Sequence, residues 1–314
     1  MDRYPPAFAR SAQFEGETLG FPLRAHPQLM FYRKDLIPEP PTSWEELIEI
    51  GKELKETNPD IAPLALYYNN DGNRQNLFIW INFLWAAGGD IFNDDWTPAW
   101  TSEEALQATE DYIALHTVHQ VTNPNSLAFV EQDARQSFMQ GNSAIIPVWW
   151  WAYSGFFNPD SSTLTKDQVA FAGMPSYQGA TKTYAISMPF SISEYSENKD
   201  AAWEFLKWLS NPEMDKANAT ERVVAGKSIV NNVVTHISSL QDPDVNAAND
   251  GIQAAAWNSL KASDIMPQIP EWPEVGDILS AAIAEAAAGG DTRQLMLDAA
   301  VQADRVLRRA GRIQ

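Results

Sequence analysis

The chain contains no cysteine, only four histidines and no long apolar run. The absence of cysteine excludes disulfide bonds, thiolate catalysis and zinc sites built on thiolates. The histidines are scattered along the sequence and do not form a metal-ligand set. The longest apolar stretches, near residues 77–89 and 144–157, are shorter than the about 20 residues that cross a bilayer.

Basic residues are also scarce, with 22 Lys and Arg against 41 Asp and Glu, so the formal net charge is −19. An excess of negative charge argues against nucleic acid or an anionic membrane surface as a partner. The first residues, MDRYPPAF, lack the basic and apolar pattern of a secretory signal. The composition, 45% hydrophobic and 20% charged, is that of an ordinary globular protein.

Helical periodicity alternates with short apolar strands along the 314 residues. Ser43 with Glu46, and Thr101 with Glu104, have the spacing of capping boxes that begin helices. Gly141 is expected just past the end of another helix. Predicted strands cover residues 18–23, 28–33, 62–68, 143–149, 168–174 and 183–190. This alternation predicts α/β layers around a largely parallel sheet.

The stretch AIIPVWWWAYSGFF, residues 144–157, places three tryptophans in a row after an apolar strand. Neighbouring side chains of a strand point to opposite faces, and those of a helix differ by about 100°. At least one of the three indoles therefore cannot share a core with the others. This makes the tryptophan run a candidate for binding.

Four segments resemble a known family in the order in which that family has them. Residues 16–54 contain a Gly-x-x-x-Gly-x-Pro strand, a Tyr-x-Lys-Asp-Leu turn and a Pro-x-Ser-Trp-Glu-Glu-Leu helix start. The other segments are FMQGNSAIIPVWWWAYS, ENKDAAWEFLKWLSNPE and DIMPQIPEWPEV. The chain resembles the extracellular solute-binding proteins (family 1) of ABC transporters, in the sugar-binding group that includes the maltose-binding protein. One local departure is Arg33, where Asn is common.

The resemblance implies an α/β fold of the two-lobed, periplasmic-binding-protein-like type II. Lobe I would comprise residues 1–28 and 185–251, and lobe II residues 29–184 and 252–314, with a hinge near 23–32 and 182–190. Family members carry several strand–helix units before the first matched strand. Lobe I is therefore expected to be incomplete at the N-terminus, through either a partial gene product or an internal start.

The function that the resemblance implies is that of a receptor without enzymatic activity. It would capture a sugar or oligosaccharide in the cleft between the lobes and deliver it to the membrane permease subunits of an ABC transporter. Ligand sites favour such domain interfaces, and hinge closure would hold the ligand. The resemblance implies no cofactor, and it implies a monomer that works in the periplasm or outside the cell in association with the membrane.

Trp151 occupies the position at which the family places a tryptophan against a sugar ring. A flat indole covers the apolar face of a pyranose at low entropic cost. Trp150 and Trp149 are expected as helpers. Packing in the core is the alternative for all three.

Arg24 and His26 alternate onto one face of the expected crossing strand. The resemblance implies that His26 replaces a carboxylate that holds sugar hydroxyls, and Arg24 is suited to binding a carboxylate, which points to an acidic or substituted sugar. The alternatives are a salt bridge for Arg24 and a cap on backbone groups for His26.

Tyr68, Asn70 and Asp71 follow a predicted strand and are expected to contact ligand hydroxyls, with a plain surface turn as the alternative. Trp272, between two prolines, is in a region that reaches the cleft in the family. Trp80 and Trp85 are expected in the core.

Two other functions remain open. A glycosidase would need a carboxylate pair facing each other across the scissile bond, and no stretch supplies an obvious pair. A truncated remnant would leave a sheet edge uncovered and bind weakly or not at all.

Overall fold

The structure is a computed structural model that describes residues 1–220, 223–224, 227–228 and 234–313. Packing divides the chain into two compact units. Unit 1 comprises Met1–Leu29, Trp149–Ser154 and Thr183–Met266, and unit 2 comprises Met30–Val148, Gly155–Lys182 and Pro267–Gln314. Compared with the predicted lobes, Trp149–Ser154 and residues 252–266 group with unit 1. The predicted range 185–251 also includes residues outside the described part.

Unit 1 is built on the longer, N-terminal part of a long strand, β3 (Phe21–Arg33), which passes into unit 2 after Leu29. Its other elements are α1 (Pro6–Ser11), β1 (Gln13–Phe14), β2 (Glu17–Thr18), β7 (Thr183–Phe190), α6 (Lys199–Leu209), α7 (Pro212–Thr220), β8 (Val223–Val224), β9 (Lys227–Ser228), α8 (Ile237–Leu240), α9 (Pro243–Ala248), α10 (Ile252–Leu260) and β10 (Ser263–Asp264). Two strands predicted separately, at 18–23 and 28–33, are thus largely one strand in the structure. The run from Leu29 to Phe31 within this strand is fully buried.

The sheet of unit 1 has β7 between β3 and β10. β3 runs antiparallel to β7, from Phe21 opposite Phe190 to Pro27 opposite Ala185, and β10 runs parallel to β7. Helix α1 packs on one face of β7, where the Ser187 hydroxyl donates to the carbonyl of Phe8 at 3.2 Å. Arg24 and His26, the two residues of β3 that were predicted to bind ligand, belong to the part of the strand that pairs with β7.

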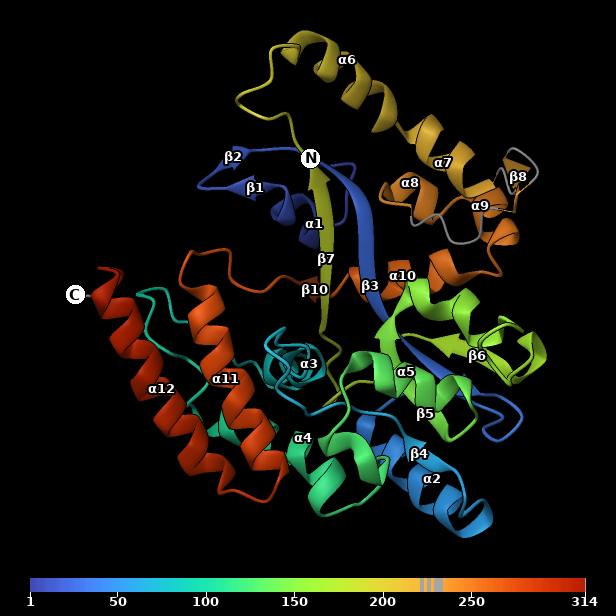
Figure 1. Ribbon diagram of the computed structural model, residues 1–314, viewed down its shortest axis with the longest axis vertical. Coiled ribbons are helices and arrows are strands. Elements are labelled where there is room, and N and C mark those ends of the chain that lie inside the picture. The colour runs from blue at the N-terminus through green and yellow to red at the C-terminus, as the bar shows by residue number, and fades with distance from the viewer. Residues whose placement is uncertain (221–222, 225–226, 229–233, 314) are drawn as a thin grey trace. The chain divides into compact units, whose positions relative to one another are not determined.

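Helix α6 of unit 1 (Figure 1) carries several exposed aromatic residues. Trp203, Phe205 and Trp208 are 46–54% exposed, and Leu206 is the buried residue of this helix. A large exposed aromatic surface is unusual on a soluble domain.

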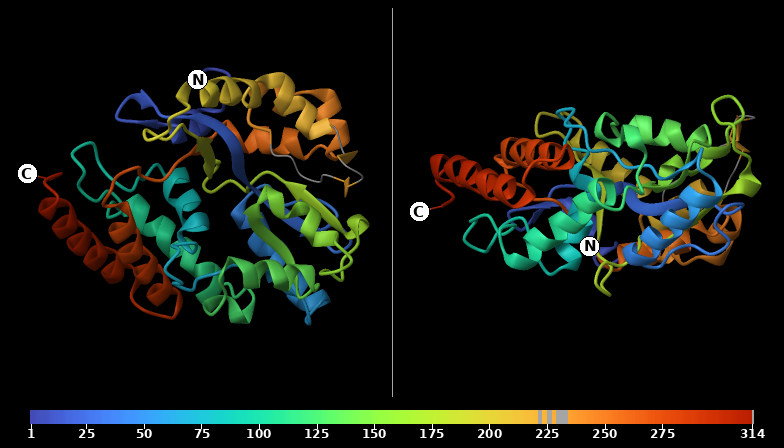
Figure 2. Two further views of the ribbon diagram at one scale, coloured as in Figure 1. Left: turned by 45° about the horizontal axis from the view of Figure 1, so that its top comes forward. Right: turned by 90° about the horizontal axis from the view of Figure 1, so that it is seen from below.

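Unit 2 contains the rest of β3 and the remaining elements. These are α2 (Trp44–Thr57), β4 (Ala62–Leu64), α3 (Leu77–Ala86), α4 (Glu103–Thr117), η1 (Pro124–Leu127), α5 (Glu131–Met139), β5 (Ser143–Trp149) up to Val148, the last three residues of η2 (Trp150–Phe157), η3 (Lys166–Gln168), β6 (Val169–Ala172), α11 (Trp272–Ala287) and α12 (Thr292–Arg309). The last two helices lie side by side in both views of Figure 2. Trp80 and Trp85 of α3 are buried, as predicted, and the Trp80 indole N–H donates to the Thr109 hydroxyl at 2.9 Å.

The prediction of a largely parallel sheet is wrong, because the sheet is mixed. β4 and β5 are parallel, but β3 pairs antiparallel with β6 in unit 2 and with β7 in unit 1. The long strand β3 sets this pattern, because β6 and β7 both run antiparallel to it.

The two predicted capping boxes also differ from the structure. Ser43 caps α2 by accepting from the Glu46 backbone N–H at 3.1 Å, but the Glu46 carboxylate returns to the N–H of Thr42 rather than of Ser43. Helix α4 is capped by Ser102, which accepts from the Ala105 N–H at 3.2 Å, and not by Thr101. Gly141 does lie just past the end of α5, with φ of 72°.

Candidate functional site

The three consecutive tryptophans lie at the carboxyl end of β5, and the structure assigns them different environments. Trp149 and Trp150 are buried, with 8% and 3% of their surfaces exposed. The Trp150 indole N–H donates to the carbonyl of Ala25 at 3.1 Å. Trp151 is half-buried. The contacts of Trp150 are those of a packing residue, whereas Trp151 is the least buried of the three tryptophans.

His26 lies beside Trp149 in unit 1. Its ring meets the Trp149 ring edge-on at 6.1 Å between centroids, and Trp149 meets Tyr184 in the same way at 5.5 Å. The Nε2 atom of His26 is buried and has no hydrogen-bond partner among the described residues. Burial, and secondly the charge of Arg24, lower the pKa of His26 to about 4. The imidazole is therefore neutral at pH 7 and offers one donor and one acceptor.

Arg24 is exposed and two residues from His26 on the same strand. A β-bulge between Pro22 and Arg24 shifts the register of β3 against β7 at this point. Within the described part of the chain, Arg24 forms no ion pair, so the salt bridge considered as an alternative is not present there.

Sequence reasoning did not identify Tyr153 and Tyr184 of unit 1. The Tyr153 hydroxyl lies 3.5 Å from a carboxylate oxygen of Asp250, and burial raises the pKa of Tyr153 to about 12. Tyr184 packs against Trp149 from β7, and burial raises its pKa as well. The signal that could have found Tyr184 is the alternation of side chains along the strand over 183–190, but only the packing shows that its ring meets Trp149.

Tyr68 of unit 2 is in the core, contrary to its prediction as a ligand contact. It is fully buried, and its hydroxyl donates to the carbonyl of Tyr112 at 3.3 Å. The strand predicted over 62–68 ends at Leu64, but the buried run continues through Tyr68, so the side chain never reaches the turn. This burial removes Tyr68 from the candidate site.

Asn70 and Asp71 are exposed at the turn after Tyr68. The Asn70 side-chain oxygen accepts from the Ser280 hydroxyl at 3.0 Å, which ties the turn to α11. Asp71 accepts from the backbone N–H of Asn73 at 2.9 Å, the arrangement of an Asx turn. Asp71 therefore has a local structural role, and Asn70 is held in a fixed position.

Trp272 is half-buried at the first position of α11. A Cβ atom on Gly276 would lie 3.4 Å from the Trp272 ring and 2.5 Å from the side chain of Arg74. The glycine thus gives space to both side chains. Arg74 in turn forms an ion pair with Asp277 at 2.8 Å.

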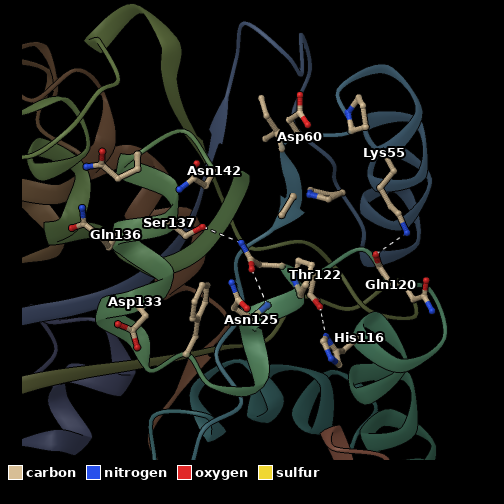
Figure 3. A pocket seen from close by; sticks show the side chains of 18 residues that line it. Lys55, Asp60, His116, Gln120, Thr122, Asn125, Asp133, Gln136, Ser137 and Asn142 are labelled. Carbon is tan, nitrogen blue, oxygen red and sulfur yellow. Dashed lines mark hydrogen bonds between the residues drawn. The ribbon is translucent and has the colours of Figure 1, made fainter.

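A large pocket of unit 2 contains none of the predicted ligand residues (Figure 3). Its volume is ≈ 870 Å³, and eight of its 18 lining residues carry amide or hydroxyl side chains. It lies at the amino ends of β4 and β5, whereas Tyr68, Asn70 and Asp71 follow the carboxyl end of β4.

No group of three or more His, Asp or Glu side chains in the described residues is arranged to hold a metal ion. None of the helices in that same part of the chain is long and apolar enough to span a bilayer.

Three comparisons place the chain among known proteins. A putative binding protein of Brucella abortus (strain 2308) is 26% identical over 98% of this chain and 72% of its own length. Among solved structures, the maltose-bound T. maritima MalE3 is similar with a TM-score of 0.80 and 21% identity, over 98% of this chain and 77% of that one. An ABC transporter solute-binding protein from Agrobacterium radiobacter K84, in complex with ribitol, is similar with a TM-score of 0.77 and 25% identity, over 97% and 76%.

These likenesses confirm the predicted two-lobed α/β fold of solute-binding proteins. The family model of the bacterial extracellular solute-binding proteins matches residues 2–216, more than half of the sequence. The chain therefore belongs to the bacterial extracellular solute-binding protein family, whose members include solute-binding components of ABC transporters.

Proposed function

We propose that this chain captures an uncharged sugar or sugar alcohol for an ABC transporter and delivers it to the membrane permease subunits. Trp151 would stack on the apolar face of the ligand, and His26 and Arg24 would contact its rim. Asn70 and Trp272 are further candidate contacts. The protein would work as a monomer in the periplasm or outside the cell, associated with the membrane through its permease, and would return the sugar unchanged.

The observation that carries this proposal is the half-buried Trp151 beside two buried tryptophans. A half-buried tryptophan just after the carboxyl end of a strand is at the edge of the sheet where α/β proteins bind ligands. Its flat apolar surface matches the C–H face of a pyranose.

The neutral imidazole of His26 supports an uncharged ligand. With a pKa of about 4, His26 offers a donor and an acceptor to hydroxyl groups at pH 7. Arg24 is the feature that would favour an acidic sugar instead. The maltose and ribitol of the two solved neighbours support the uncharged class.

Isothermal titration calorimetry with maltose, ribitol, glucuronate and a mixture of amino acids tests the ligand class. We expect binding of a neutral sugar or polyol. Tighter binding of glucuronate would assign the acidic class and give Arg24 its role. Binding of an amino acid alone would contradict the sugar proposal.

The role of Trp151 is tested in the same assay with Trp151→Ala. Loss of one stacked aromatic contact is expected to weaken binding by about 1–3 kcal/mol, with partial recovery in Trp151→Phe. Trp208→Ala, which removes an exposed indole of α6, is the matched control and should bind normally. Unchanged affinity of Trp151→Ala would show that the indole does not stack on the ligand.

A further inference from the structure

The pocket of unit 2 has a rigid polar floor (Figure 3). The side-chain amide of Asn123 donates to the hydroxyls of Ser137 at 3.2 Å and Ser143 at 3.4 Å, and its oxygen accepts from the Asn125 N–H at 2.9 Å. Asn123, Ser137 and Ser143 are all buried. They join the segment before η1, helix α5 and the start of β5, so the floor is organised before any ligand arrives.

A second set of side-chain bonds fixes one side of the pocket. The His116 Nδ1 and the Thr122 hydroxyl lie 2.6 Å apart, and Lys55 Nζ donates to the carbonyl of Gln120 at 3.1 Å. Burial lowers the pKa of His116, so its ring is neutral at pH 7. The ammonium of Lys55 therefore donates to a backbone carbonyl, and it forms no ion pair with the described residues.

The rim of the pocket carries side-chain amides available to a ligand. Asn125, Gln136 and Asn142 are exposed, and within the described residues their side-chain amides make no hydrogen bond. Each amide offers two donors and an acceptor. The carboxylates of Asp60 and Asp133 also line the pocket, which disfavours an anionic ligand.

The main chain around the pocket is already paired, which argues against an added peptide strand. Leu64 donates to the carbonyl of Val121 at 3.0 Å and accepts from the N–H of Asn123 at 2.8 Å. Ala62 donates to the carbonyl of Asn142 at 2.9 Å. Adding a strand requires a row of unpaired backbone N–H and C=O groups at a sheet edge. The backbone groups of Ala62 and Leu64 named above already have hydrogen-bond partners.

The groups of this pocket that can contact a ligand are therefore mainly neutral polar side chains and a few apolar surfaces. Pro59, Pro124 and Phe129 supply the apolar surfaces. Amides beside apolar patches match a ligand that has hydroxyl groups around C–H faces. A volume of ≈ 870 Å³ is within the range of small-molecule sites.

We propose that this pocket is a second binding site, for an uncharged polyhydroxylated molecule such as a neutral oligosaccharide or a sugar alcohol. It belongs to unit 2 alone and lies at the opposite end of β4 from Asn70 and Asp71. It does not depend on the ligand site proposed above.

Side-chain amide NMR of the full chain carrying Trp151→Ala tests the proposal, because that background weakens the other site. Maltose and ribitol are the probes, and glucuronate is the charged comparator. At least one of the two neutral probes should shift the amide signals of Asn125, Gln136 and Asn142 in a saturable way. Adding Gln136→Ala and Asn142→Ala together should weaken this binding about tenfold, as expected for two lost hydrogen bonds.

Gln132→Ala is the matched control, since Gln132 is exposed one turn earlier on α5 and does not line the pocket. Its affinity should equal that of the parent. The proposal is overturned if neither neutral probe gives a saturable shift, or if Gln132→Ala weakens binding as much as the paired variant. Glucuronate binding as tightly as the neutral probes would refute the uncharged class.

Discussion

Neighbouring residues of identical type have different roles in this protein because their side chains meet different surroundings. Trp150 donates its indole N–H to the carbonyl of Ala25 in the core, and Trp151, one residue later, is half-buried. Chemistry common to all tryptophans cannot separate these roles. The direction of each side chain at the end of β5 separates them.

Trp150→Phe should lower stability while leaving ligand affinity unchanged. The substitution removes the hydrogen bond to Ala25 and leaves that buried carbonyl without this donor, at a cost of about 1–2 kcal/mol. Chemical denaturation measures the loss, with Trp151→Phe as the control that should retain stability. Equal stability of the two variants would argue against a packing role for Trp150.

His26 should make the stability of the protein depend on pH. Its pKa of about 4 in the folded chain is below the ordinary 6.5, so between these values the unfolded chain binds a proton that the folded chain does not. The contribution of neutral His26 is therefore fully present above pH 6.5 and is lost as the pH falls toward 4. Allowing for its partial exposure, the loss should be about 1–2 kcal/mol.

The measurement compares the free energy of unfolding of the wild type and His26→Gln at several pH values. Groups common to both chains, including the carboxylates, cancel in the difference. The difference should shift in favour of the variant between pH 6.5 and 4. A constant difference across this window would mean that the imidazole titrates normally in the folded chain.

Helix starts show how local signals and tertiary context combine at the scale of elements. Ser43 begins α2 as the sequence predicts, but the start of α4 is one residue later than predicted, at Ser102. Thr101 and Ser102 are both good capping residues. Three residues later, Thr101 has Glu104 and Ser102 has Ala105. Adjacent capping candidates cannot be distinguished by type alone.

Ser102→Ala should destabilise the protein by about 1 kcal/mol, because the N–H of Ala105 loses its side-chain acceptor. Thr101→Ala is the matched control and should change stability by only a few tenths of a kcal/mol. Thermal and denaturant unfolding of the two variants provide the comparison. A larger effect of Thr101→Ala would reverse the assignment of the cap.

At the scale of the whole molecule, exposed apolar surface is concentrated in unit 1. Of the twelve exposed large hydrophobic residues in the described chain, eight belong to this unit: Phe14, Leu19, Met188, Phe190, Tyr195, Trp203, Phe205 and Trp208. Exposed apolar side chains that gather on one surface promote association between molecules, and α6 carries three of these residues, Trp203, Phe205 and Trp208. The solution behaviour of the chain should therefore depend on α6.

Replacing Trp208 with Gln should reduce self-association without lowering the melting temperature. The side chain is more than half exposed, so little packing is lost, and polar groups on this face weaken contacts between molecules. Light scattering and differential scanning calorimetry measure the two effects. A clear fall in the melting temperature would show that Trp208 stabilises the fold.

Much of the candidate site was predictable because it follows strand ends. The strand over 143–149 and the strand over 183–190 were located from their apolar runs, and these place Trp149 and Tyr184. Tyr68 was predicted at the start of the polar loop, but the buried run of the chain extends through it, so its side chain lies in the core. The amide-lined pocket of unit 2 was missed altogether, since its residues come from two stretches far apart in the sequence, 55–63 and 116–142, with no shared motif.

The sequence by itself determined the family, the α/β class and the positions of most helices and strands. These depend on local periodicity and on motifs that occur in order along the chain. Only the tertiary structure decided that the sheet is mixed, that Trp150 packs while Trp151 is partly exposed, and that His26 is neutral. Those properties depend on contacts between residues far apart in sequence, which set burial, hydrogen bonding and the pKa of each side chain.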